Sequence, residues 1–179
     1  STSGDTLAAS QNFVSYEFPQ PCLCHMPFNL KMIRSINFES QLYLAKQFNL
    51  PVNIHSRKTH DQIFTFLKRI PLSKLGVVHG FSGSYDQAKR FVDLGYKIGV
   101  GGTITYERAN KTRQAIAKLP LDALVLETDS PDMPVFGFQG QPNRPERIVE
   151  SFKALCTLRN EPAELIKKVT WENACQIFS

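Results

Sequence analysis

Apolar residues recur along the chain in two alternating spacings. Short runs of consecutive apolar residues predict buried strands. Between them lie stretches with apolar residues three or four positions apart, which predict helices. Alternation of this kind is typical of βαβ units and predicts an α/β fold with a parallel sheet. The four expected strands read PVNIH, GVVHG, YKIGVGG and ALVLETD, at residues 51–55, 76–80, 96–102 and 123–129.

Several residues mark the ends of the expected helices. Ser84 is a suitable N-cap for the helix after the second strand, and Gly95 is a suitable stop for the same helix. After the fourth strand, Asn143 is placed to cap a long helix, and Pro145 lies in its first turn.

The pattern divides the chain into two parts. Residues 1–35 contain several prolines and show no clear period, so we expect an irregular segment there. From residue 36 the helical spacing is clear, and Pro51 ends the first helix. Residues 36–179 are therefore predicted to form one domain of about four βα units.

Composition and charge narrow the class of protein. Of the 179 residues, 42% are hydrophobic and 21% are charged, which is normal for a soluble globular protein. The formal net charge of +5 permits a polyanionic partner such as nucleic acid but does not require one. No apolar stretch approaches the ~20 residues of a membrane-spanning helix. The first residues carry no leader signal, although the chain begins at Ser1 and not at Met, so we expect a cytoplasmic protein without a membrane partner.

The four cysteines do not form a zinc motif. Cys22 and Cys24 lie close together, but the second pair of ligands that a structural zinc site needs is missing. We therefore expect reduced thiols.

Polar residues stand at the ends of the expected strands. The first strand ends at His55, the second at His79 and the fourth at Asp129. The carboxyl ends of parallel strands lie side by side, so these three residues are expected to gather at one rim, where α/β proteins build their sites. Taken singly, each residue is better explained as a hydrogen-bonded histidine or as an acid that caps the next helix. Their shared position favours a divalent metal site, because imidazole and carboxylate suit Zn, Mn or Fe.

Two other features lie near the same rim. The third strand ends in GVGG at residues 99–102, which does not match a dinucleotide-binding fingerprint and favours close backbone approach to a ligand, such as an anion. Arg57 and Lys58 follow His55 directly and are placed to hold phosphate oxygens, although a solvated basic turn explains them equally well.

Five stretches together resemble a known family. The five stretches are PVNIHSR, VVHGFSGS, YKIGVGGTITY, LVLETDSPDMP and GQPNRPE. Their order and spacing are similar to those of TatD-family metal-dependent hydrolases, and their residues are most similar to the YjjV branch. The resemblance covers roughly residues 36–179. It implies a TIM barrel of the amidohydrolase type and up to two divalent metal ions (Mg, Zn or Mn) at the C-terminal rim. It also implies hydrolysis of ester bonds, as in the Mg-dependent deoxyribonucleases of the family.

The resemblance implies roles for individual residues. His55 and His79 match metal ligands. Asp129 matches a metal ligand that also accepts a proton from the attacking water. Glu127 belongs to the same motif and is expected to support Asp129, because alternation along a strand places both side chains on one side.

Substrate contacts are expected from basic residues. Arg57 and Arg144 are predicted to hold phosphates of a DNA substrate, and such contacts are sensitive to salt. No protein partner is predicted.

Two motifs of the family are absent. The sequence has neither the H-x-H strand nor the G-E-I-G-L-D strand, whose glutamate bridges two metal ions in the family. Glu17 stands near the right distance, but its surroundings do not match. The chain therefore resembles the C-terminal half of the family's barrel, behind a segment, residues 1–35, that is genuine, truncated or frameshifted. We expect its hydrolysis to be impaired.

Three functions fit the sequence. The first is a metal-dependent phosphodiesterase of the TatD type. The second is an inactive fragment or pseudoenzyme, or a chain that completes a barrel with another, which the missing motifs favour. The third is a hydrolase of a different ester, such as an aminoacyl-nucleic acid, which fits the same rim residues.

Overall fold

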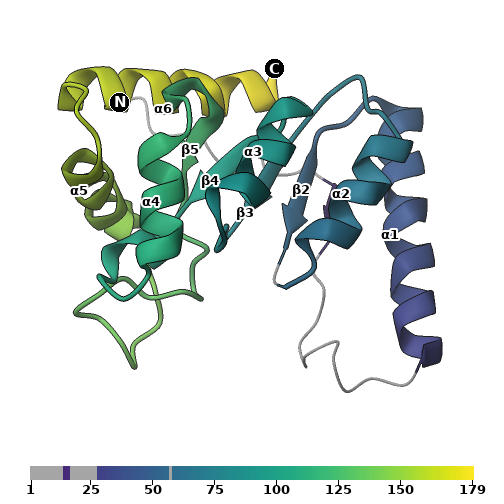
Figure 1. The fold of residues 1–179 in the computed structure, drawn as a ribbon, viewed down its shortest axis with the longest axis horizontal. Coiled ribbons are helices and arrows are strands. Elements are labelled where there is room, and N and C mark those ends of the chain that lie inside the picture. The colour runs from purple at the N-terminus through teal and green to yellow at the C-terminus, as the bar shows by residue number, and fades with distance from the viewer. Residues whose placement is uncertain (1–13, 17–27, 57) are drawn as a thin grey trace, which may run out of the picture.

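A parallel sheet of five strands forms the centre of the molecule (Figure 1). The computed structural model describes residues 14–16, 28–56 and 58–179. Within them the strands lie in sequence order from β1 to β5, and every neighbouring pair is parallel. The strands are β1 (Val14–Tyr16), β2 (Val52–His55), β3 (Val77–His79), β4 (Lys97–Val100) and β5 (Leu124–Leu126).

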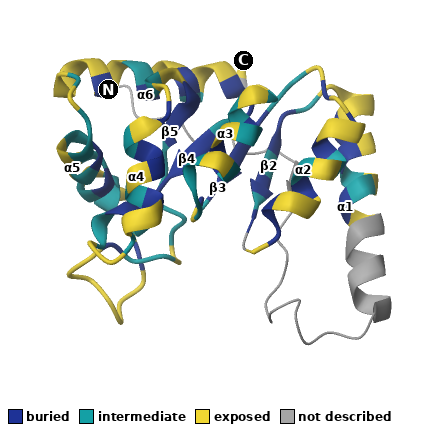
Figure 2. Ribbon diagram, in the orientation of Figure 1, coloured by how far each residue is buried: buried dark blue, intermediate teal, exposed yellow. Residues whose placement is uncertain are grey.

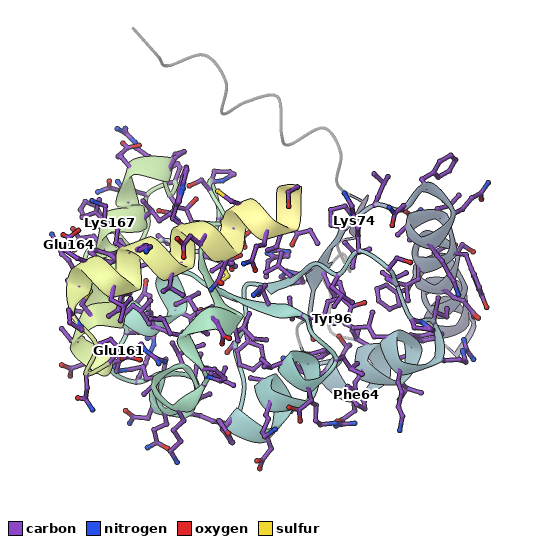
Figure 3. The ribbon with its side chains drawn as sticks, turned by 90° about the horizontal axis from the view of Figure 1, so that it is seen from above. Phe64, Lys74, Tyr96, Glu161, Glu164 and Lys167 are labelled. Atoms are coloured by element: carbon purple, nitrogen blue, oxygen red, sulfur yellow. The ribbon has the colours of Figure 1, made fainter. Side chains whose placement is uncertain are left out.

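Helices follow the strands and pack on the sheet. In Figure 1, α6 crosses the top of the sheet, and the view from above shows it in front of the strands (Figure 3). No helix in the described ranges is long and apolar enough to cross a membrane. The α-helices are α1 (Phe28–Phe48), α2 (His60–Arg69), α3 (Tyr85–Asp93), α4 (Asn110–Lys118), α5 (Ile148–Leu158) and α6 (Ala163–Phe178), and the 3₁₀ turns are η3 (Gly102–Thr105), η4 (Leu121–Ala123) and η5 (Pro145–Arg147).

The main core lies between the sheet and its helices. Ile54, Val78, Ile98 and Leu124 pair across β2 to β5 in one row of the register, and each is at most 1% exposed. Because side chains alternate along a strand, this row faces one side and the neighbouring residues face the other. Figure 2 shows the buried strands beneath helices whose outer faces are exposed. His55 and His79 therefore point away from the main core.

The predicted α/β fold with a parallel sheet is confirmed, and so are two helix ends. Ser84 accepts a hydrogen bond from the Gln87 backbone N–H, and the Gln87 side chain accepts one from the Ser84 N–H. Gly95 adopts a φ of 92°, which favours glycine.

The structure differs from the sequence prediction at the N-terminal side. Strand β1 and the first turns of α1 lie within residues 1–35, which were expected to be irregular. A three-residue strand is too short to show alternation, and β1 is defined by its pairing with β2. Helix α1 begins at Phe28 because FNLKMIRS contains several good helix formers and neither proline nor glycine.

Candidate functional site

Two histidines end neighbouring strands at the same level. His55 of β2 is the register partner of His79 of β3, and their ring centroids are 4.9 Å apart. His79 is 8% exposed, and His55 is half-buried. The structure thus brings together the two imidazoles that the sequence placed at one rim.

Asp129 reaches the same place from a loop and not from a strand. β5 was expected to run to residue 129 but ends at Leu126. Asp129 has a φ of 56°, in the left-handed region, which is incompatible with a strand. Its Oδ1 lies 3.6 Å from His79 Nδ1. A Cβ placed on Gly80 would lie 3.8 Å from His55 Nδ1 and 3.9 Å from Asp129 Oδ2, so these two side chains approach the residue that follows His79.

Glu127 extends its side chain across β4 toward the end of β3. The backbone N–H of Gly80 donates a hydrogen bond to Glu127 Oε1. A Cβ on Gly99 would overlap the Glu127 carboxyl group, so only glycine leaves room for it there. The glycine at 99 was interpreted as room for an anionic ligand, and the group it accommodates is the protein's own carboxyl.

The surroundings of Glu127 favour its neutral form. Burial raises the pKa of Glu127 from its ordinary 4.5 to about 8, although the hydrogen bond from Gly80 opposes the rise and the charge of Asp129 adds to it. Glu127 and Asp129 do approach the same point, as expected. The reason is the path of the loop after Leu126, not alternation along a strand.

Asn143 fastens the loop that carries Asp129. Its Nδ2 donates to the carbonyls of Thr128 and Met133, at 2.7 and 3.1 Å, and its backbone N–H donates to Pro131 at 2.7 Å. The residue is 4% exposed. The prediction that Asn143 caps the following helix is wrong, because Arg144 is the N-cap of η5. Sequence reasoning missed this role because an asparagine just before the first turn of a helix also fits a cap.

The predicted substrate-binding residues are placed only in part. Arg144 is exposed, and its Nη1 lies 3.8 Å from Glu146 Oε1. Arg57 lies outside the described residues, as do Glu17, Cys22 and Cys24. The roles of Arg57 and Arg144 stay predictions.

The rim has suitable donor groups for a metal ion, but they are not arranged in a coordination geometry. Two imidazoles and a carboxylate match the ligand chemistry of zinc and related cations. However, no group of three or more His, Cys, Asp or Glu side chains in the part of the chain that the structure describes is arranged to hold a metal ion. The donors are gathered around Gly80, and a bound cation would require them to turn toward a common point.

Comparisons with known proteins point to one family. The model of the family described as TatD related DNase matches residues 30–179. An uncharacterized metal-dependent hydrolase of Haemophilus influenzae is 99% identical over 142 residues, which are 79% of this chain and 54% of that protein. The uncharacterized metal-dependent hydrolase YjjV of Escherichia coli is 61% identical, with 79% of this chain and 54% of that protein covered.

Solved structures show the same fold. The crystal structure of the TatD homologue YjjV from Escherichia coli superposes with a TM-score of 0.82 and 55% identity, covering 86% of this chain and 60% of that one. A TatD-family hydrolase from Entamoeba histolytica gives a TM-score of 0.71 at 16% identity, covering 82% and 57%. The expected TIM-barrel, amidohydrolase-like fold is thereby confirmed for the region compared. The chain spans about half the length of the curated relatives it matches.

Proposed function

The chain belongs to the family of TatD related DNases, and from this premise we propose that it carries part of the metal site of a hydrolase that cleaves phosphodiester bonds. The observation that supports the proposal is the convergence of His55, His79 and Asp129 around Gly80. Relatives of the chain are named metal-dependent hydrolases, so dependence on a metal is the property that they share by name.

Asp129 is the proposed proton acceptor. Its side chain is 24% exposed, so water and substrate can reach it, and its Oδ1 lies 3.6 Å from His79 Nδ1. The left-handed backbone at Asp129, fastened through Asn143, aims the carboxylate back at the ends of β2 and β3. A proton released by the attacking water would pass to Asp129 Oδ2 or Oδ1.

The other residues hold and tune this arrangement. His55 and His79 are the proposed nitrogen donors for a divalent cation, with Mg, Zn or Mn as candidates. Such a cation activates water and neutralises charge on the phosphoryl oxygens. Glu127, hydrogen-bonded to Gly80, fixes the end of β3 next to His79.

We further propose that hydrolysis by the chain alone is impaired. No three-donor group in the described ranges is set for a metal ion, and the sequence has neither the H-x-H nor the G-E-I-G-L-D motif. The same observations support the alternative of a non-catalytic fragment.

Hydrolysis of labelled single-stranded DNA in Mg²⁺, Mn²⁺ or Zn²⁺ tests the proposal. The wild-type chain is compared with His79→Ala and Asp129→Asn. Weak activity that both variants abolish supports the proposed site. Equal activity in all three proteins would refute it, and a content of two metal ions per wild-type chain would refute the impairment.

A further inference from the structure

A cavity opens at the carboxyl end of the sheet, near the candidate metal site. It has a volume of about 350 Å³ and lies between the connections that follow β2, β3 and β4. Since these strands are parallel, all three connections leave the sheet at the rim that carries His55 and His79. Its lining includes Lys58, His60, Gly83, Arg108, Lys111 and Thr112.

The charge around this cavity has one sign. Lys58, Arg108 and Lys111 line it, and no acidic residue does. In the part of the chain that the structure describes, none of the three takes part in an ion pair with a carboxylate. The Arg108 guanidinium lies 4.9 Å from the centroid of the Tyr106 ring, and this contact restricts the conformations of the Arg108 side chain.

A helix end without a side-chain cap faces the same cavity. α4 begins at Asn110, and its N-cap, Ala109, has no side chain that can accept a hydrogen bond. The first N–H groups of such a helix carry partial positive charge and favour an anion. The neighbouring helix α3 differs, because Ser84 and Gln87 satisfy its first turn.

Buried His60 gives independent evidence that the cavity binds a ligand, because one of its nitrogen atoms lacks a hydrogen-bond partner in the described part of the chain. His60 lines the cavity and is 6% exposed, and its Nε2 has no hydrogen-bond partner among the described residues. Burial lowers the pKa of His60; Asp61 opposes this and Lys111 adds to it. The imidazole is therefore neutral near pH 7 and keeps one N–H to donate. Buried polar atoms without partners are uncommon, and a ligand oxygen would satisfy Nε2 in the tautomer that carries its proton there.

We propose that this cavity binds a phosphate group of the substrate strand, next to the phosphate that is cleaved. The proposal rests on the proposed function and deepens it, because it makes a nucleotide strand the substrate and not a small monoester. Lys58 follows His55 by three residues, and Ser82, which also lines the cavity, follows Gly80 by two. Two residues span at most about 7 Å, so the cavity adjoins the candidate metal site.

Binding of fluorescein-labelled single-stranded DNA in EDTA tests the proposal without catalysis. Lys111→Ala is compared with Lys118→Ala, which removes the same charge from the exposed far end of α4. We expect Lys111→Ala to weaken binding about three- to tenfold and to lower the salt slope by about 0.7, the loss of one single-strand phosphate contact. Lys118→Ala should match the wild type. Equal affinities of the two variants would overturn the proposal.

Imidazole NMR resonances give a second readout. DNA should shift the His60 signals of the wild type and of Lys118→Ala, and shift them less in Lys111→Ala. A shift with inorganic phosphate but not with DNA would show a free-anion site and overturn the substrate subsite. The DNA assay contains no metal, so a protein that binds DNA through Lys111 but hydrolyses nothing would refute only the proposed function. Hydrolysis with unchanged binding in Lys111→Ala would refute only the subsite.

Discussion

The two ends of the parallel sheet differ in how well their polar groups are satisfied. At the amino end, Asn173 of α6 is 2% exposed, and its Nδ2 donates to the carbonyls of Leu121 and Leu124 at 3.0 and 2.7 Å. Lys97 Nζ donates to the carbonyl of Asp122 at 2.6 Å. These contacts join α6, η4 and the start of β4, so this end holds the fold together.

The carboxyl end has the opposite character. Ser56, Thr59 and His60, which follow β2, each have a buried side-chain atom without a partner among the described residues. Lys58 and Asp129 have positive φ although neither is glycine. Strain and unsatisfied polar atoms concentrate where a protein meets a ligand, because the ligand completes them. Asn49 and Tyr96, which precede β2 and β4, show these features singly, as a positive φ and as a buried hydroxyl without a partner among the described residues. The amino end is therefore the better satisfied of the two, and the carboxyl end is the better suited to binding.

Removing the Asp129 carboxylate should give the largest effect at the carboxyl end. We expect Asp129→Asn to reduce metal affinity by at least about 100-fold and any hydrolysis by about 10²- to 10⁴-fold. Stability should stay within about 0.5 kcal/mol, because asparagine also tolerates positive φ. Titration calorimetry with Mn²⁺ and urea unfolding measure the two properties. Asp132→Asn, an exposed acid in the same loop, is the control. A matching loss in that control would show a general charge effect.

The raised pKa of Glu127 should make stability depend on pH. The folded chain keeps a proton on Glu127 up to about pH 8, whereas the unfolded chain loses it near the ordinary 4.5. The contribution is therefore full below the unfolded pKa and is lost as pH rises toward 8, by at most about 5 kcal/mol. Urea unfolding in a chelator at several pH values measures this. Glu127→Gln should flatten the dependence, and an unchanged slope in that variant would contradict the assignment.

The residues of the candidate site could be predicted from the sequence because the strand pattern and the family resemblance point to the same rim. Period and strand ends placed His55 and His79 at one level, and register pairing confirms this. The same pattern placed Asp129 at the rim and the family resemblance added Glu127, and both approach Gly80. The sequence could not predict how they arrive there. Their approach depends on the left-handed backbone at Asp129 and on the space that Gly99 leaves for the Glu127 carboxyl group. Both are set by tertiary structure.

The missed features share one cause. β1 exists through its pairing with β2, and Asn143 acts through carbonyls of residues ten and fifteen positions earlier. His60 lies in a largely polar stretch of sequence, yet it is buried against the Phe81 and Phe91 rings. Each is decided by contacts between segments, which local pattern does not contain.

Two buried asparagines compare the ends directly. Asn173→Ala removes two side-chain hydrogen bonds at the amino end, to the carbonyls of Leu121 and Leu124, so we expect a loss of about 1–3 kcal/mol in the free energy of unfolding with metal affinity unchanged. Asn143→Ala loosens the loop around Asp129, so we expect a smaller loss of stability but metal affinity lowered about 10- to 100-fold. Urea unfolding and Mn²⁺ titration of both variants measure these two effects. If the loss of stability and the loss of metal affinity stood in the same ratio in the two variants, the distinction between the two ends would be refuted.

The smallest effect should come from the exposed arginine at the carboxyl end. Arg144 is predicted to hold a substrate phosphate, and its nearest described carboxylate is Glu146 at 3.8 Å. Surface charge contacts are weak, so Arg144→Ala should weaken DNA binding only about two- to fivefold and leave unfolding unchanged. Glu146→Gln removes the competing partner and should strengthen binding by a similar factor. DNA anisotropy at two salt concentrations measures both. If both substitutions shift affinity in the same direction, Arg144 acts on the loop and not on a phosphate, and the binding character of this end rests on the cavity at His60 and Lys111.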